Sequence, residues 1–132
     1  MAVTENQLIT ARNPSNLVPI PVEASTQIYE GTIVYYDAAT GYAVDDDNAG
    51  ANAVAGIAKA ESDNSGGSAG DTTVEVYQEG EFELEGTGFT QANVGDIMDG
   101  TDNYTIATTG GSAVGRATEF ISSTRLMVKL DI

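Results

Sequence analysis

The chain contains no cysteine and no histidine among its 132 residues. Without cysteine there are no disulfides, no thiolate nucleophile and no zinc–thiolate site. Without histidine there is no imidazole general base and no Ser-His-Asp triad, and most catalytic transition-metal sites lose their usual ligand. An enzyme built from this chain would have to rely on carboxylate chemistry, lysine chemistry or a divalent metal held by oxygen ligands. We therefore predict that the protein is not an enzyme and carries no cofactor.

Tryptophan is also absent, and phenylalanine occurs only three times. A core must therefore be built largely from valine, isoleucine, leucine, alanine and tyrosine. Fifteen glycines against three prolines indicate many tight turns, which is typical of short strands in a barrel or a sandwich. A chain of this length is expected to form one domain. A hydrolase with paired carboxylates would want an aromatic-walled cleft, so it is the weakest of the functions considered.

Basic residues are scarce: 5 Lys and Arg stand against 20 Asp and Glu, for a formal net charge of −15. Such a surface is repelled by nucleic-acid phosphates and by anionic membranes, so neither is expected as a partner. Two interpretations of the acidity stay open. It is either a solvated outer surface that resists aggregation or suits a salty medium, or it complements a basic surface or bound divalent cations on a larger shell.

Long apolar runs are missing as well. No stretch approaches the ~18 residues that span a bilayer. The first ten residues, MAVTENQLIT, lack the basic region and the apolar region of a signal peptide. We therefore expect synthesis in a cytosol.

Residues 1–24 are polar and weakly periodic and are predicted to form an extended N-terminal arm, while residues 25–132 form a single β-domain. Pro19 and Pro21 fix φ near the polyproline value and remove two backbone donors, so this segment is neither a helix nor a central strand. The apolar anchors of the arm are Leu17, Val18, Ile20 and Val22. Two interpretations stay open: a frayed terminus, or an arm that orders only against a neighbouring subunit.

From Thr26 onward the sequence favours short strands separated by turns, because no apolar period of 3.6 residues persists over twelve residues. We predict an all-β fold, a small antiparallel β-barrel or β-tulip-like domain. Thr90–Val94 is predicted to form one helical turn with Thr90 as its N-cap. The expected strands are Gln27–Tyr29, Thr32–Asp37, Gly41–Val44, Val54–Glu61, Thr72–Gln78, Glu81–Glu85, Asp96–Met98, Asn103–Ala107, Ala113–Phe120 and Arg125–Ile132.

Two acidic loops resemble cation sites only in composition. Asp45–Asn48 departs from a calcium-binding EF-hand loop, because Ala49 stands where an oxygen ligand belongs and no glutamate follows at the twelfth position. Asp63–Asp71 matches a calcium-binding β-roll repeat once and with imperfect spacing. We interpret the first as a solvated turn and the second as a mobile surface loop, and we predict no metal site.

The segment Glu81-Phe82-Glu83-Leu84-Glu85 alternates between acidic and apolar residues, so a strand here places three carboxylates on one face. Three of the five basic residues, Arg116, Arg125 and Lys129, lie close to the C-terminus. We predict that these cations lie beside the acidic face, on a neighbouring strand or across a subunit boundary, and that they fix strand register. The competing interpretation is that the glutamates are simply solvated.

Short glycine-rich pieces follow one another in a set order along residues 17–132. They are Ile20-Pro21-Val22, Tyr29-Glu30-Gly31, Asp37–Val44, Val54–Ala58, Asp63–Gly67, Val74-Glu75-Val76, Thr90–Asp96 and Ala113–Ala117. In this layout the chain resembles the small capsid decoration (cement) proteins of tailed bacteriophages.

The resemblance implies a non-enzymatic virion protein that binds the outer surface of an assembled capsid and reinforces contacts between major capsid subunits. It also implies a homotrimer whose N-terminal segment is pinned to the shell, where the second attachment raises avidity. On this basis Leu17, Val18, Ile20 and Val22 are predicted to contact the capsid or a neighbouring subunit, although each of them could instead pack on its own domain.

The alternative is a carbohydrate-binding or adhesin-like β-module on a virion surface. Six tyrosines could supply faces on which sugars stack, and Tyr29, Tyr35 and Tyr36 lie close together in the sequence. Strand alternation, however, places Tyr35 and Tyr36 on opposite faces, so these two cannot form one platform.

Overall fold

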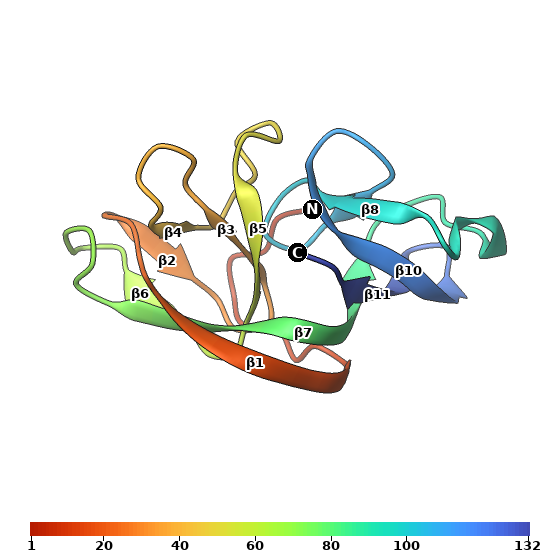
Figure 1. The fold of residues 1–132 in the computed structure, drawn as a ribbon, viewed down its shortest axis with the longest axis horizontal. Coiled ribbons are helices and arrows are strands. Elements are labelled where there is room, and N and C mark those ends of the chain that lie inside the picture. The colour runs from red at the N-terminus through yellow and green to blue at the C-terminus, as the bar shows by residue number, and fades with distance from the viewer.

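The computed structural model describes all of residues 1–132. Its regular elements are β-strands and one short 3-10 helix (Figure 1). This confirms the predicted all-β fold. The helix η1 (Gln91–Asn93) has Thr90 as its N-cap, as predicted. No helix is long and apolar enough to cross a membrane. The strands are β1 (Ala11–Pro21), β2 (Thr26–Ile28), β3 (Ile33–Tyr36), β4 (Ala43–Val44), β5 (Ala53–Ala58), β6 (Ser62–Asn64), β7 (Thr73–Glu85), β8 (Ile97–Gly100), β9 (Ile106–Ala107), β10 (Ser112–Ser122) and β11 (Arg125–Leu130).

The main antiparallel sheet is arranged around the long strand β7. Glu81 and Phe82 of β7 have partners on both β1 and β11, so these two strands lie on opposite edges of β7. Val76 and Tyr77 likewise pair with β1 and with β5. Strand β1 therefore runs along one edge of β7, while β5 and β11 share the other edge. Figure 1 shows β1 and β7 along the bottom, with two groups of strands rising from them.

The two groups, β5–β3–β4 and β11–β10–β8–β9, curl toward each other and give the sheet the shape of a half-barrel. Contacts between the groups close the curl. The backbone N–H of Ile33 donates to the carbonyl of Asn103 at 2.7 Å. The Tyr35 hydroxyl donates to the carbonyl of Asp102 at 2.7 Å, and the Ser112 hydroxyl donates to the carbonyl of Asn52.

Two apolar cores lie on the two faces of this sheet. The first core fills the curl with 15 buried residues, among them Ile33, Tyr35, Phe82, Leu84 and Leu126. The second core has nine buried residues and includes side chains from β1, β2, β3, β5 and β7. Because β3 contributes side chains to both cores, its sequence is apolar throughout and does not alternate between apolar and polar residues.

Strand β7 reverses its faces at Gly80. Val76 belongs to the second core and Phe82 to the first. The two are six positions apart, and in a regular strand residues at an even offset lie on the same face. Gly80 has a φ of +124°, and the register of β1 shifts opposite to it, between Arg12 and Ser15. The prediction of two strands here, Thr72–Gln78 and Glu81–Glu85, is wrong, because β7 is continuous from Thr73 to Glu85. The irregular backbone at Gly80 does not end the strand.

The segment predicted as a separate arm is part of the fold. Residues 11–21 form β1, which pairs with β7 alone, so the prolines stand in an edge strand and not in a central one. Further upstream, Val3 exchanges two hydrogen bonds of 2.8 Å with the side chain of Asn103. The backbone N–H of Gln7 donates to the carbonyl of Glu30 at 2.8 Å. The alternation of Val18, Ile20 and Val22 explains why β1 pairs with β7, because the alternation places these three side chains on the face of the sheet that holds the second core.

The expected mobile loop Asp63–Asp71 also contains regular structure. Its first two residues belong to β6, which pairs with β2 in a small second sheet. Asn64 is buried, and its amide nitrogen donates to the carbonyls of Val22, Glu23 and Ser68 at 2.9–3.2 Å. The bonds to Val22 and Glu23 tie the loop to the end of β1, and the bond to Ser68 braces the loop itself, so the interpretation of a mobile loop is wrong.

Candidate functional site

Of the four apolar residues predicted to make external contacts, three face the protein's own interior and one is exposed. Ile20 and Val22 are buried in the second core, and Val18 packs against it. The prediction that Ile20 and Val22 contact a partner is therefore wrong, because their side chains point into the protein's own interior. Leu17, in contrast, is 38% exposed.

The outer edge of β1 is blocked against pairing with another strand. The backbone N–H of Val22 donates to the carbonyl of Thr72 at 2.9 Å, toward β7. Bonding positions alternate along an antiparallel strand, so Pro19 and Pro21 occupy the positions that face the free edge. Those positions have no N–H to offer an incoming strand. The face that carries Leu17, Pro19 and Pro21 is exposed and holds no charge of its own.

The acidic alternation of β7 takes the predicted orientation. Phe82 and Leu84 point into the first core, and the carboxylates of Glu81, Glu83 and Glu85 lie on the opposite, outer face of the sheet. This outer face continues onto β11, whose residues Arg125, Met127 and Lys129 are the direct cross-strand partners of the three glutamates.

Arg125 lies opposite Glu85, and the guanidinium comes within 4.0 Å of that carboxylate. Arg125 also donates to the Tyr104 hydroxyl at 2.9 Å and lies over the Tyr104 ring, 5.6 Å from its centre. The hydrogen bond to Tyr104 raises the pKa of Arg125. The cation is thus held by a ring and a hydroxyl in addition to a carboxylate.

A single row of cross-strand partners crosses five strands of the outer face. The register places them in the order Ile97 on β8, Arg116 on β10, Lys129 on β11, Glu81 on β7 and Arg12 on β1. We call these five residues the cross-sheet row. Three of its members are basic and one is acidic, in a chain that has only five basic residues.

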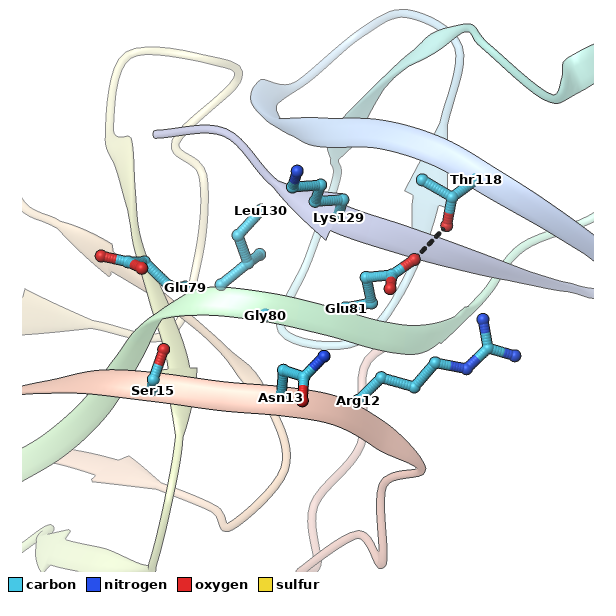
Figure 2. A pocket seen from close by; sticks show the side chains of 9 residues that line it. All are labelled: Arg12, Asn13, Ser15, Glu79, Gly80, Glu81, Thr118, Lys129 and Leu130. Atoms are coloured by element: carbon cyan, nitrogen blue, oxygen red, sulfur yellow. Dashed lines mark hydrogen bonds between the residues drawn. The ribbon is translucent and has the colours of Figure 1, made fainter.

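A surface trough of about 520 Å³ lies along this row (Figure 2). Figure 2 shows the Glu81 carboxylate directed at Thr118, whose hydroxyl donates to it at 2.7 Å. The Arg12 guanidinium contacts Glu119 at 2.5 Å, and this contact raises the pKa of Arg12. The trough is lined by Arg12, Asn13, Ser15, Glu79, Gly80, Glu81, Thr118, Lys129 and Leu130.

A second hollow of about 300 Å³ shares Thr118, Lys129 and Leu130 with the trough and extends it to Arg116 and Asp131. The lining is almost entirely polar and contains no tyrosine. This arrangement can hold charged and hydrogen-bonding groups on an open surface, and it offers no stacking face for a sugar ring.

The tyrosines proposed for sugar stacking lie elsewhere. Tyr35 is buried in the first core and Tyr36 packs against the second, so the two do lie on opposite faces as predicted. Burial, with Asp47 and Asp102 nearby, raises the pKa of the Tyr35 phenol. Tyr29 is half-buried, and its hydroxyl donates to Gln27 at 3.2 Å.

The acidic loop Asp45–Asn48 is held by its own backbone. Asp46 accepts a hydrogen bond from the N–H of Asn48 at 3.0 Å, and the buried Asp47 accepts one from Gly50 at 3.2 Å. Burial raises the pKa of Asp45. In the second loop, hydrogen bonds from Ser65 lower the pKa of Asp63. No group of three or more acidic residues in the chain converges closely enough to hold a metal ion.

Comparison with known protein families, with curated proteins and with solved structures finds no match to this chain. The geometry of the outer face is therefore the starting point for any functional conclusion.

Of the residues that line the trough, sequence reasoning singled out only Glu81 and Lys129; Arg12 and Thr118 are the most important of those it missed. Arg12 was assigned to a separate arm, although the alternation of Val18, Ile20 and Val22 was a signal that this segment could join a sheet. Thr118 lies at a register shift in β10, and nothing in the local sequence marks such a shift.

Proposed function

We propose that this protein is a non-enzymatic structural protein of a bacteriophage virion, located on the outer surface of the capsid, where it reinforces contacts between major capsid subunits. The observation that carries the proposal is the edge position of β1. This strand is attached to the sheet on one side only and presents Leu17, Pro19 and Pro21 to the outside. The extended segment Leu17–Pro21, which has no charged side chain, forms the edge of an acidic domain, and this supports attachment to a larger surface.

The contact assignment follows from burial. Leu17 is the one apolar anchor of the segment whose side chain is exposed, so we assign the shell contact to Leu17 with Pro19 and Pro21. An apolar contact of this kind contributes about 25 cal/mol for each Å² removed from water. One such strip gives weak binding, and a homotrimer would multiply it through avidity. We propose a trimer for this reason and for the resemblance described above.

The blocked edge of β1 supports the same proposal in a second way. Neighbouring copies on a shell stand at high local concentration, and an open strand edge would let them pair with one another. Because Pro19 and Pro21 remove the donors of the free edge, copies can crowd on a surface without joining into a continuous sheet.

Co-sedimentation tests the proposal. Expanded shells assembled from the major capsid protein of the same phage should carry the protein into the pellet at a fixed ratio to shell subunits. A glycan array probed in parallel addresses the carbohydrate-binding alternative. Pelleting with shells and an empty array is the expected result; an unbound protein with clear glycan hits would overturn the proposal in favour of the alternative.

A further inference from the structure

Two basic residues of the cross-sheet row face each other. Arg116 and Lys129 are direct cross-strand partners on β10 and β11. Like charges placed directly opposite each other destabilise a sheet. Although the chain carries 20 carboxylates on side chains, none lies within 4.0 Å of either cation. Neither cation therefore has an ion-pair partner within the protein, although Glu81 lies opposite Lys129 on β7 and Asp131 lines the adjoining hollow.

Neither Arg116 nor Lys129 contacts Glu81, the acidic member of the cross-sheet row. The Arg116 guanidinium donates to the carbonyl of Gly95 at 2.5 Å, which fixes its position. The carboxylate of Glu81 is engaged with Thr118, and in Figure 2 the Lys129 ammonium points away from it. At the other end of the row Arg12 is paired with Glu119. Of the three cations in the row, only Arg116 and Lys129 are therefore free for an external partner.

We propose that the Arg116–Lys129 end of the trough is a docking site for an acidic segment of another protein, with a carboxylate of that segment lying between the two cations. Asn13, Ser15 and Thr118 supply further hydrogen-bonding groups along the trough. Ile97, the next residue of the row, is 41% exposed and gives an apolar contact beside Arg116. The assignment stands independently of attachment to a capsid, because it concerns the isolated domain.

The chemistry favours a protein segment over the other anions. Nucleic acid is repelled by the net charge of −15, since it carries phosphate along its whole length. A small free anion would gain only what one or two solvent-exposed ion pairs offer, which is ~0.2–1 kcal/mol each. An extended segment can add polar and apolar contacts along the trough. At 0.15 M salt charges more than ~8 Å away are screened, so a partner responds mainly to the charges at the trough itself, where Arg116 and Lys129 lie beside Glu81 and Asp131.

An NMR titration of the isolated, ¹⁵N-labelled protein tests the proposal. The probe is the capped peptide Ser-Glu-Ser-Glu-Ser, with Ser-Gln-Ser-Gln-Ser as its uncharged counterpart. We expect amide shifts confined to the trough, at Asn13, Arg116, Thr118 and Lys129, with the glutamate peptide and not with the glutamine peptide. The double variant Arg116→Glu/Lys129→Glu should weaken binding at least fivefold, on the order expected for reversing two exposed ion pairs.

The variant Lys59→Glu is the matched control, because Lys59 is exposed, is not among the residues that line the trough or its extension, and undergoes the same change of charge. It should bind the peptide as the parent does. Arg116→Gln/Lys129→Gln, which removes charge without adding any, should weaken binding to a smaller extent. Thermal melts of every variant establish that each is folded.

Three outcomes would overturn the proposal. Equal weakening by Lys59→Glu would mean that net charge and not the trough governs binding. Acetate at the same carboxylate concentration producing the same shifts and saturation would identify a site for small anions. Shifts at the trough that grow with protein concentration alone, in the absence of peptide, would replace the acidic segment by a second copy of the chain.

Discussion

Gly80 of β7 lies so close to Pro14 of β1 that a Cβ atom added at Gly80 would be 2.9 Å from the Pro14 Cα. The φ of Gly80, +124°, is also one that residues with a side chain rarely adopt. We expect Gly80→Ala to destabilise the fold by about 1–3 kcal/mol, because the backbone of β1 must move and the strand must hold a strained φ. Chemical denaturation measures this, with Gly66→Ala as the control, since Gly66 has open space around it and should tolerate alanine.

The docking of β1 predicts resistance to trypsin. Arg12 is the only lysine or arginine before Lys59, so any cleavage in the first 58 residues must occur there. Because β1 is hydrogen-bonded to β7, we expect the native protein to remain uncut at Arg12 under conditions that cleave an unfolded control. Mass spectrometry reads the result. Rapid removal of residues 1–12 from the native protein would mean that this segment is detached in solution.

Arg125 and Lys129 occupy similar positions on β11 but differ in their contacts. Arg125 bonds to Tyr104 and lies near Glu85, whereas Lys129 has no carboxylate within 4.0 Å and faces Arg116. We expect Arg125→Ala to cost about 1 kcal/mol of folding free energy. Lys129→Ala should leave stability near that of the parent. Thermal melts over a salt series measure both; equal losses would show that strand position, and not the Tyr104 contact, decides stability.

Asp45→Asn should raise the melting temperature at neutral pH. Burial raises the pKa of Asp45 in the folded state above its ordinary value, so folding disfavours the charged carboxylate. The resulting destabilisation is present above the raised folded pKa and is lost as pH falls through that pKa to the unfolded value. The gain from asparagine should therefore be largest near pH 7 and absent below about pH 3.8, the ordinary value for Asp. Melts from pH 3 to pH 8 measure it, and a gain that does not vary with pH would contradict the assigned cause.

The sequence was sufficient for the fold class and for the strands with clear alternation. Glu81–Glu85 and the strand from Arg125 onward follow the two-residue period, and their inward residues lie in the first core, although Met127, at an outward position, is buried as well. Thr90 could be recognised as an N-cap from local chemistry alone. These features depend on neighbours within a few residues of one another.

The features that were missed depend on contacts between distant segments. Whether Leu17 to Val22 remains a free arm or joins a sheet depends on the unpaired edge of β7, more than 50 residues later. The cross-sheet row arises from four separate strand pairings, and no local sequence feature at Arg12, Arg116 or Lys129 indicates their registers. A short strand such as β6 is visible only through its pairing with β2.

The central claim, attachment to a capsid through the exposed face of β1, is tested most directly by one comparison in quantitative co-sedimentation with expanded shells. Leu17→Asp places a charge on the proposed contact, and Ile121→Asp makes the same change at a residue of nearly equal exposure on β10, 38% against 40%. The account predicts that Leu17→Asp lowers occupancy of the shell at least about fivefold, while Ile121→Asp binds as the parent does. Equal occupancy for both variants and the parent would contradict it.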